Sequence, residues 1–163
     1  MQIAAKEDWQ KWKAAANDGA VDGRITGMLK SLSDDIAARG PTCWSSGKCC
    51  NFNAYGHRLY VTGLEVCWTL SQIASRPSLL PLLEKPVDLA GTCSFQVDKL
   101  CGVHPMRPMG CRVYFCQQGT AEWQNQLYEK YQSQIRELHD ELKIPYLYAE
   151  WRALLAEAKL SGV

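Results

Sequence analysis

Apolar side chains recur at helical spacing near the start of the chain. Residues 4–16 place two Trp and two Ala three and four positions apart, which predicts a short amphipathic helix ending at Asn17-Asp18-Gly19. A second helix is expected over 21–39, because Gly40-Pro41 supplies a stop signal. These two helices make up an N-terminal helical region, residues 4–39.

The C-terminal region, residues 120–160, has a longer helical pattern. Apolar residues over 123–142 follow one another at steps of four, four, four, three and four, which predicts one long amphipathic helix. Pro145 breaks this helix, and a last helix is expected over 146–160 with proline at its first turn. His139 lies one position past the apolar stripe, so we expect it to be solvated.

Residues 41–118 combine Gly, Pro and Cys in a way that interrupts regular periodicity, so loops around a site are expected. One helix is predicted inside this region, over 62–75, where an initial Thr and a Glu three positions later form a capping box. Cys67 falls on the apolar face of that helix, in a core-like position. Residues 75–86 hold three Pro and are expected to be irregular.

The sequence therefore predicts a mainly α fold: a single small domain over 1–163, with about five helices and an irregular cysteine-rich metal-binding loop region. A chain of 163 residues is long enough for one domain with its own core. The formal net charge of +1 offers no field for a polyanion, so no nucleic-acid partner is expected. No stretch approaches the roughly 20 apolar residues of a membrane helix, so no membrane partner is expected either, and a protein partner cannot be identified.

The chain contains eight Cys, all between Cys43 and Cys116. The N-terminus lacks the basic start and apolar run of a secretory signal, which favours a cytosolic address. In a reducing cytosol, many thiols indicate metal ligation or redox chemistry more often than disulfides.

Seven of these thiols form two blocks: Cys43, Cys49 and Cys50, then Cys93, Cys101, Cys111 and Cys116. A zinc or iron–sulfur site needs four soft ligands that converge from short, bendable segments. Neighbouring side chains in an extended segment point in opposite directions, so Cys49 and Cys50 favour two metal centres or one polynuclear centre. His57 or His104 is available as a nitrogen ligand. The alternative is that some of these Cys are simply buried, and for Cys67 it is the favoured interpretation.

Several cationic side chains accompany the cysteine blocks: Lys48, Arg58, Lys99, Arg107 and Arg112. Four thiolates on a divalent ion leave net negative charge, which these cations would balance. Capture of an anionic substrate is the alternative. We also expect Arg107 to pair with Glu65.

The motifs occur in a distinctive order: Cys43-Trp-Ser-Ser46-Gly-Lys-Cys49-Cys50, Val61-Thr-Gly-Leu-Glu65, Cys93-Ser-Phe95, Cys101-Gly-Val-His104, Arg107-Pro108 and Cys111-Arg-Val-Tyr-Phe-Cys116. Over roughly 41–118 this order resembles the YkgJ-type cysteine-cluster family, which is marked by CxxCxxCC, a CPFL-like element and an RPxxCRxxxC-like ending. That family is associated with chelation of zinc or iron. The resemblance implies that Zn²⁺ or iron, as a single ion or an iron–sulfur cluster, is held by Cys43, Cys49, Cys50, Cys93, Cys101, Cys111 and Cys116.

The sequence departs from the family pattern at three places. Ser46 stands at the second Cys of CxxCxxCC, Ser94 stands at the Pro of the CPFL-like element, and His104 replaces the usual Tyr. Serine is a much weaker ligand for soft metals, so one centre would lack a thiolate. The vacancy would leave an open coordination position, a smaller site, or a place for His104, Cys67 or water.

The leading hypothesis is a cytosolic cysteine-cluster protein that chelates zinc or iron through both blocks. One alternative is a metalloenzyme whose open coordination site faces a cleft between the cysteine loops and the aromatic C-terminal helices. Another is a thiol redox or metal-carrier protein in which Cys49-Cys50 exchanges metal or oxidises. Standard catalytic signatures such as CxxxCxxC, GxxxxGK[ST], GxSxG and HExxH are absent, so no catalytic residue is assigned. We expect Cys49, Cys50, Cys111 and Cys116 to be essential ligands and Cys67 to be dispensable.

Overall fold

The N-terminal part of the chain forms two helices that end where the sequence predicts. The computed structural model describes residues 2–41, 47–115 and 117–163. Helix α1 spans Lys6–Ala16 and α2 spans Gly19–Arg39. The Asp18 side chain accepts from the first backbone N–H groups of α2, and Gly40, at a φ of 60°, ends it in the left-handed conformation. Both predicted boundaries are thereby confirmed.

The middle of the chain is built around one buried helix, α4, which spans Gly63–Ala74. Its Thr62 and Glu65 form the predicted capping box. The remaining elements here are short: α3 (Phe52–Tyr55), β1 (Tyr60–Thr62), α5 (Leu80–Glu84), β2 (Gln96–Val97), β3 (Leu100–Cys101) and α6 (Met109–Val113). The expectation that 75–86 is irregular is wrong for most of that stretch, because its first two prolines begin a 3-10 turn and α5 instead of breaking them.

In the C-terminal region the long predicted helix is confirmed, whereas the last helix begins later than predicted. Helix α7 spans Ala121–Leu142. Residues Tyr148–Glu150 form a strand, β4, that pairs antiparallel with β1, and only then does α8 begin, spanning Trp151–Leu160. Pro145 therefore precedes a strand rather than opening a helix, because the pairing with β1 holds residues 148–150 extended.

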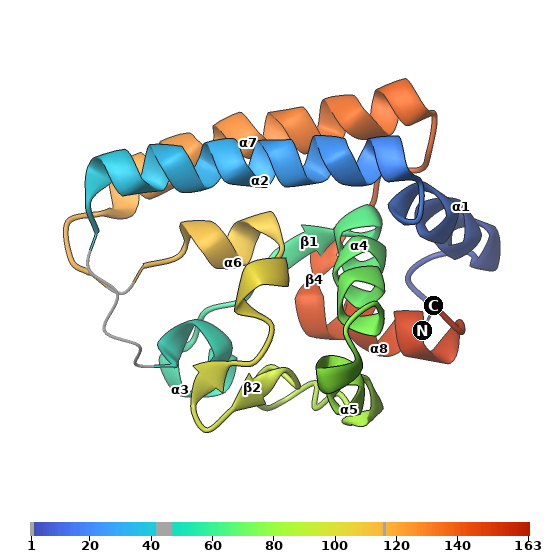
Figure 1. Cartoon of the computed structure of the whole chain (residues 1–163). Coiled ribbons are helices and arrows are strands. Elements are labelled where there is room, and N and C mark those ends of the chain that lie inside the picture. The colour runs from blue at the N-terminus through green and yellow to red at the C-terminus, as the bar shows by residue number, and fades with distance from the viewer. Residues whose placement is uncertain (1, 42–46, 116) are drawn as a thin grey trace.

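The helices pack in a layered arrangement in which the cysteine-rich segments occupy one half (Figure 1). Helices α2 and α7 lie side by side above α4 and α6, while α1 and α8 flank α4. Glu157 on α8 accepts hydrogen bonds from the backbone N–H groups of Ile3 and Ala4 and from the indole of Trp9, which ties the start of the chain to its last helix. The predicted mainly α single-domain fold is confirmed. Among the helices of the described residues, none is both long and apolar enough to cross a membrane.

A close contact between α1 and α4 leads to a stability prediction. A Cβ at Gly63 would lie 2.3 Å from the ring of Trp12, which is fully buried and whose indole donates to the Pro145 carbonyl at 2.7 Å. Gly63→Ala should therefore lower the free energy of unfolding by about 1–3 kcal/mol, because Trp12 cannot move aside. Gly27→Ala, in α2, meets no atom within 4 Å and should raise it by up to about 1 kcal/mol. Urea unfolding measures both, and shifts in the same direction would contradict this packing.

His139 is fully buried, so the expectation that it is solvated is wrong. Its Nδ1 donates to the Pro145 carbonyl at 2.7 Å, and its ring stands edge-on to Tyr146. Among the described residues its buried Nε2 has no partner. The segment after α7 folds back over the ring, which the helical pattern alone does not reveal. Burial lowers the pKa of His139 below its ordinary 6.5.

The buried imidazole predicts acid sensitivity. As the pH falls below about 6.5, His139 takes up a proton in the unfolded chain before it does so in the folded chain. The contribution of neutral His139 to the free energy of unfolding is therefore complete above about pH 6.5, and it is lost as the pH falls towards the pKa of the folded chain. The loss approaches about 1.4 kcal/mol per pH unit in that window. His139→Gln, whose amide can still donate to Pro145, should lose less stability than the original chain between pH 7.5 and 5.5 in urea unfolding. Equal losses in the two proteins would contradict this explanation.

Candidate metal centre

Five of the seven predicted ligands lie within the described residues, and they come from four separate segments. Cys49 and Cys50 lie in a 3-10 turn, Lys48–Cys50, just before α3. The other three are on the loop after α5 (Cys93), on β3 (Cys101) and on α6 (Cys111). Cys43, Ser46 and Cys116 lie outside the described residues. All six described cysteines are free thiols.

Cys50 is the centre of a thiol cluster made by Cys49, Cys50, Cys93, Cys101 and Cys111. Its Sγ lies 4.0 Å from that of Cys49, and the thiols of Cys101 and Cys93 lie near enough to shift its pKa. The backbone N–H of Cys93 donates to the Cys50 carbonyl at 2.8 Å, which joins the two blocks through their main chains. The two cysteine blocks therefore meet at one point.

The hydrogen bonds within the thiol cluster divide its members by acidity. Hydrogen bonding to Cys101, Cys49 and Cys93, together with burial, raises the pKa of Cys50 well above its ordinary value. The hydrogen bond from Cys50 lowers the pKa of Cys49 to about 6 and that of Cys101 to about 7, and it lowers the pKa of Cys93 as well. Cys50 keeps its proton and thus stands among three neighbours, Cys49, Cys93 and Cys101, that favour the thiolate, the form that binds metal. At Cys111 burial favours the protonated thiol.

Nitrogen donors also point at the cluster sulfurs. The indole of Trp151 donates to Cys93 Sγ at 3.4 Å, and the backbone of Phe95 hydrogen-bonds to the same sulfur. The backbone of Val103 hydrogen-bonds to Cys101 in the same way, two residues on. Phe95 and Trp151 are both buried and meet edge to face at 6.0 Å, so the donors are held in place. Hydrogen bonds to sulfur are characteristic of the outer shell around metal thiolates.

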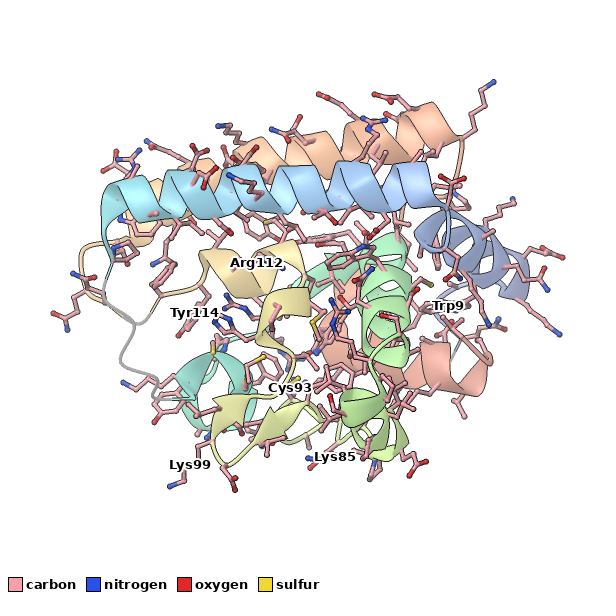
Figure 2. All side chains as sticks on the ribbon, in the orientation of Figure 1. Trp9, Lys85, Cys93, Lys99, Arg112 and Tyr114 are labelled. Carbon is pink, nitrogen blue, oxygen red and sulfur yellow. The ribbon has the colours of Figure 1, made fainter. Side chains whose placement is uncertain are left out.

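Two of the predicted cations lie close enough to act on the thiols. The positive charge of Arg107 adds to the lowering of the Cys49 and Cys101 pKa values that Cys50 causes. At Cys111 burial raises the pKa of the thiol well above its ordinary value, and Arg107 only partly opposes this. Figure 2 shows Arg112 in the interior near the sulfur atoms, while Lys99 lies at the outer edge of the hairpin formed by the antiparallel strands β2 and β3. Arg107 and Arg112 therefore fit the charge-balancing role expected from the sequence.

Glu65 does not pair with Arg107, so that expectation is wrong. Arg107 donates instead to the carbonyls of His104 and Cys111, at 3.0 and 3.2 Å. The carboxylate of Glu65 caps α4 through Thr62 and accepts from the backbone N–H of Met109 at 3.1 Å. Because Met109 begins α6, Glu65 fixes the helix on which Cys111 lies.

Cys67 occupies the core position that its helical pattern predicts. It is 2 % exposed on α4, and burial raises its pKa to about 12. The positive charge of Lys13 on α1 partly opposes this rise in pKa, whereas the cluster thiols do not contribute to it. The two histidines predicted as nitrogen ligands lie in different surroundings. His104 is exposed to solvent. The ring of His57 stacks on that of Tyr114, with 4.6 Å between the ring centroids.

The donor set suits a thiophilic metal. A tetrahedral zinc site with Zn–S bonds of about 2.3 Å separates its sulfurs by roughly 3.8 Å, close to the 4.0 Å between Cys49 and Cys50. Within residues 2–41, 47–115 and 117–163, no group of three or more Cys, His, Asp or Glu side chains is arranged to hold a metal ion as it stands. Binding would therefore require the sulfurs to draw together, as occurs when metal binding is coupled to local folding.

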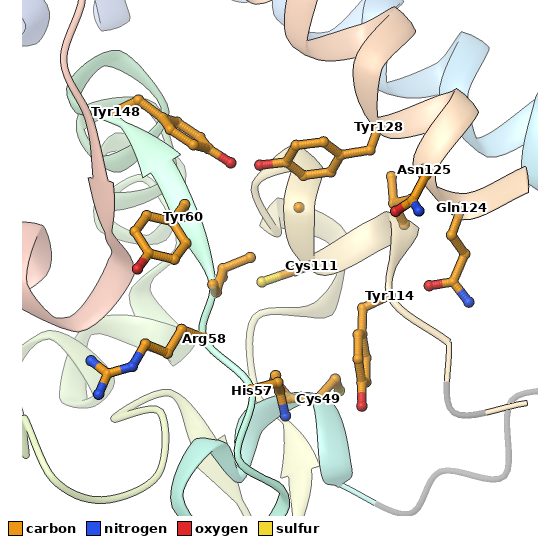
Figure 3. A pocket seen from close by; sticks show the side chains of 13 residues that line it. Cys49, His57, Arg58, Tyr60, Cys111, Tyr114, Gln124, Asn125, Tyr128 and Tyr148 are labelled. Carbon is orange, nitrogen blue, oxygen red and sulfur yellow. The ribbon is translucent and has the colours of Figure 1, made fainter. Parts of the chain in front are cut away.

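A cavity of about 340 Å³ adjoins the thiol cluster. It lies between the β1–β4 pair and helices α6 and α7, and two cluster cysteines, Cys49 and Cys111, line it (Figure 3). Its other walls include four tyrosines.

Comparisons with protein-family models, with curated proteins and with solved structures each find no significant match to this chain.

Proposed function

We propose that this protein binds zinc or iron through cysteine thiolates from both blocks. The observation that supports the proposal best is the meeting of the two blocks, where the backbone N–H of Cys93 donates to the Cys50 carbonyl at 2.8 Å across some forty intervening residues. Chains seldom gather unpaired thiols in a reducing environment unless the thiols bind metal or carry out redox chemistry. In this proposal Cys43 and Cys116 add further thiolates, as the resemblance to the YkgJ-type family implies.

The surroundings of the thiol cluster agree with this proposal. A divalent ion with four thiolates carries net negative charge, which the Arg107 guanidinium and the N–H donors at Cys93 and Cys101 would balance. The bound metal would supply a cross-link between segments that have little regular structure of their own. Its chemical role at this level is structural.

A metalloenzyme is the second candidate, and the cavity is the observation that favours it. Cys49 and Cys111 belong both to the thiol cluster and to the cavity wall. A small molecule could therefore reach a metal bound at these cysteines through the cavity, without passing through the core. An open coordination position is the feature that separates catalytic from structural zinc sites.

Titration with Co²⁺ under anaerobic conditions tests the proposal. Cobalt replaces zinc in thiolate sites and produces an intense near-ultraviolet sulfur-to-metal absorption. That absorption should rise linearly with added Co²⁺ and stop at a whole number of ions per chain. An assay of reduced thiols on the same sample is the control. Fully reduced thiols with no sulfur-to-cobalt absorption would overturn the proposal.

A further inference from the structure

The cavity beside the thiol cluster is a candidate binding site for a small molecule. Its volume of about 340 Å³ lies at the lower end of the range of roughly 300–1,000 Å³ typical of such sites. Gly110 and Cys111 on α6 form part of its wall, together with Cys49 from the first cysteine block. A molecule in this cavity would lie against the thiol cluster.

Aromatic rings line the cavity on two sides. Tyr60 and Tyr148 come from the paired strands β1 and β4, and their ring centroids lie 5.7 Å apart. His57 and Tyr114 form a second, stacked pair with an interplanar angle of 12°. Ring faces of this kind favour a planar ligand, because flat groups stack on them over a large area.

Hydrogen-bond donors are concentrated at one end of the cavity. The hydroxyl groups of Tyr128 on α7 and Tyr148 on β4 point toward each other across it (Figure 3). Within the described part of the chain, no hydrogen bond engages either hydroxyl. Burial, with the nearby charge of Glu65, raises the pKa of Tyr148 to about 12, so this hydroxyl keeps its proton at neutral pH. The two phenols can therefore donate to one acceptor group between them.

The charge of the lining favours the entry of an anion into the cavity. Arg58 is the one Lys, Arg, Asp or Glu among the described lining residues. Its guanidinium extends outward at the edge of the cavity (Figure 3), where it would attract an anion from solvent. The Nδ1 atom of His57 is buried and lacks a hydrogen-bond partner in the described part of the chain, so one further polar group near the thiols is unsatisfied.

We propose that this cavity binds a small planar carboxylate, such as an aromatic acid, beside the metal centre. The carboxylate accepts hydrogen bonds from Tyr128 and Tyr148, and the flat part of the molecule lies between the aromatic walls. The inference rests on the proposed function, because it places the ligand against the wall formed by Cys49 and Cys111. A metal held by those thiols would then be in contact with the ligand.

The test uses benzoate and the full chain loaded with Co²⁺, with metal content measured on every sample. Benzoate should bind with a dissociation constant on the order of 1 mM, as expected for so small a ligand, and should perturb the cobalt absorption. Cyclohexanecarboxylate, which is not flat, and benzyl alcohol, which is not charged, should each bind at least about tenfold more weakly. The double variant Tyr128→Phe/Tyr148→Phe should also lose at least about tenfold in benzoate affinity.

Tyr146→Phe is the matched control, because its hydroxyl is bonded to Gln132 at 2.7 Å outside the cavity. This variant should bind benzoate like the original chain. Full cobalt loading without benzoate binding, or benzoate binding that the double variant leaves unchanged, would overturn the carboxylate site while leaving the metal proposal intact. Absence of cobalt binding would count against the proposed function, and nuclear magnetic resonance titration of that same protein with benzoate would still decide whether the cavity binds carboxylates.

Discussion

Cys50→Ala should lose most of the bound metal. The pKa of Cys50 responds to the thiols of Cys49, Cys93 and Cys101, which places Cys50 between them, so its removal opens the centre of the thiol cluster. Loss of an outer-shell partner typically weakens a metal site by roughly 10–100-fold, and loss of a thiolate ligand should cost at least about 100-fold. Metal per chain, measured after dialysis against a weak chelator, gives the result directly.

Cys67→Ala is the matched control for that experiment. Both cysteines are free and buried, at 7 % and 2 % exposure, so the two substitutions remove the same group from similar surroundings. Cys67→Ala should cost about 1 kcal/mol of packing and leave the metal content unchanged. Equal metal loss in both variants would instead mean that Cys67 fills the ligand position left by Ser46, and the proposed ligand set would then be wrong.

Chelation of the metal should unfold the cysteine-rich segments locally while the helical core stays folded. The segments 47–57 and 93–113 contain only short elements, whereas α4 is buried along most of its length between α1 and α8. A metal present at 100 times its dissociation constant adds about 2.7 kcal/mol to the structure that binds it. Its removal should therefore lower amide protection in those segments by about 100-fold.

Hydrogen exchange measured by mass spectrometry distinguishes this local effect from global unfolding. Peptides from α4 and from 153–160 in α8 should keep their protection after chelation, because these parts of the helices pack mainly against other helices and not against the thiol cluster. The Cys50→Ala variant should show the same pattern without any chelator. Unchanged protection at 93–113 after complete metal removal would show that the thiol cluster is held by packing alone.

The sequence predicts those elements whose signals are local. Apolar spacing identifies α1, α2 and α7, and the capping box identifies the start of α4. Strand β4 is missed because residues 148–150 become extended only through pairing with β1, nearly ninety residues earlier in the chain. The burial of His139 is missed for the same reason, since the segment after Pro145 that covers it is not part of the helix.

The candidate metal centre likewise combines features that local sequence patterns predict with features that depend on tertiary packing. Cysteine spacing indicates which thiols to consider, but not that Cys50 stands at their centre, because this depends on how the loop after α5 returns to the turn at 48–50. The indole donor at Cys93 comes from Trp151, fifty-eight residues away, and no sequence pattern links the two. Glu65 is a capping residue by pattern, whereas its bond to Met109 depends on the packing of α6 against the start of α4.

Elemental analysis of the full chain, expressed and purified without oxygen or added metal, tests the central claim most directly. The account predicts at least one zinc or iron per chain, with acid-labile sulfide and a brown colour if the metal is an iron–sulfur cluster. Chelation should release this metal and make Cys49, Cys50, Cys93, Cys101 and Cys111 available to thiol reagents. A folded, fully reduced chain that contains no transition metal, binds none on reconstitution and keeps the same stability with chelator present would contradict it.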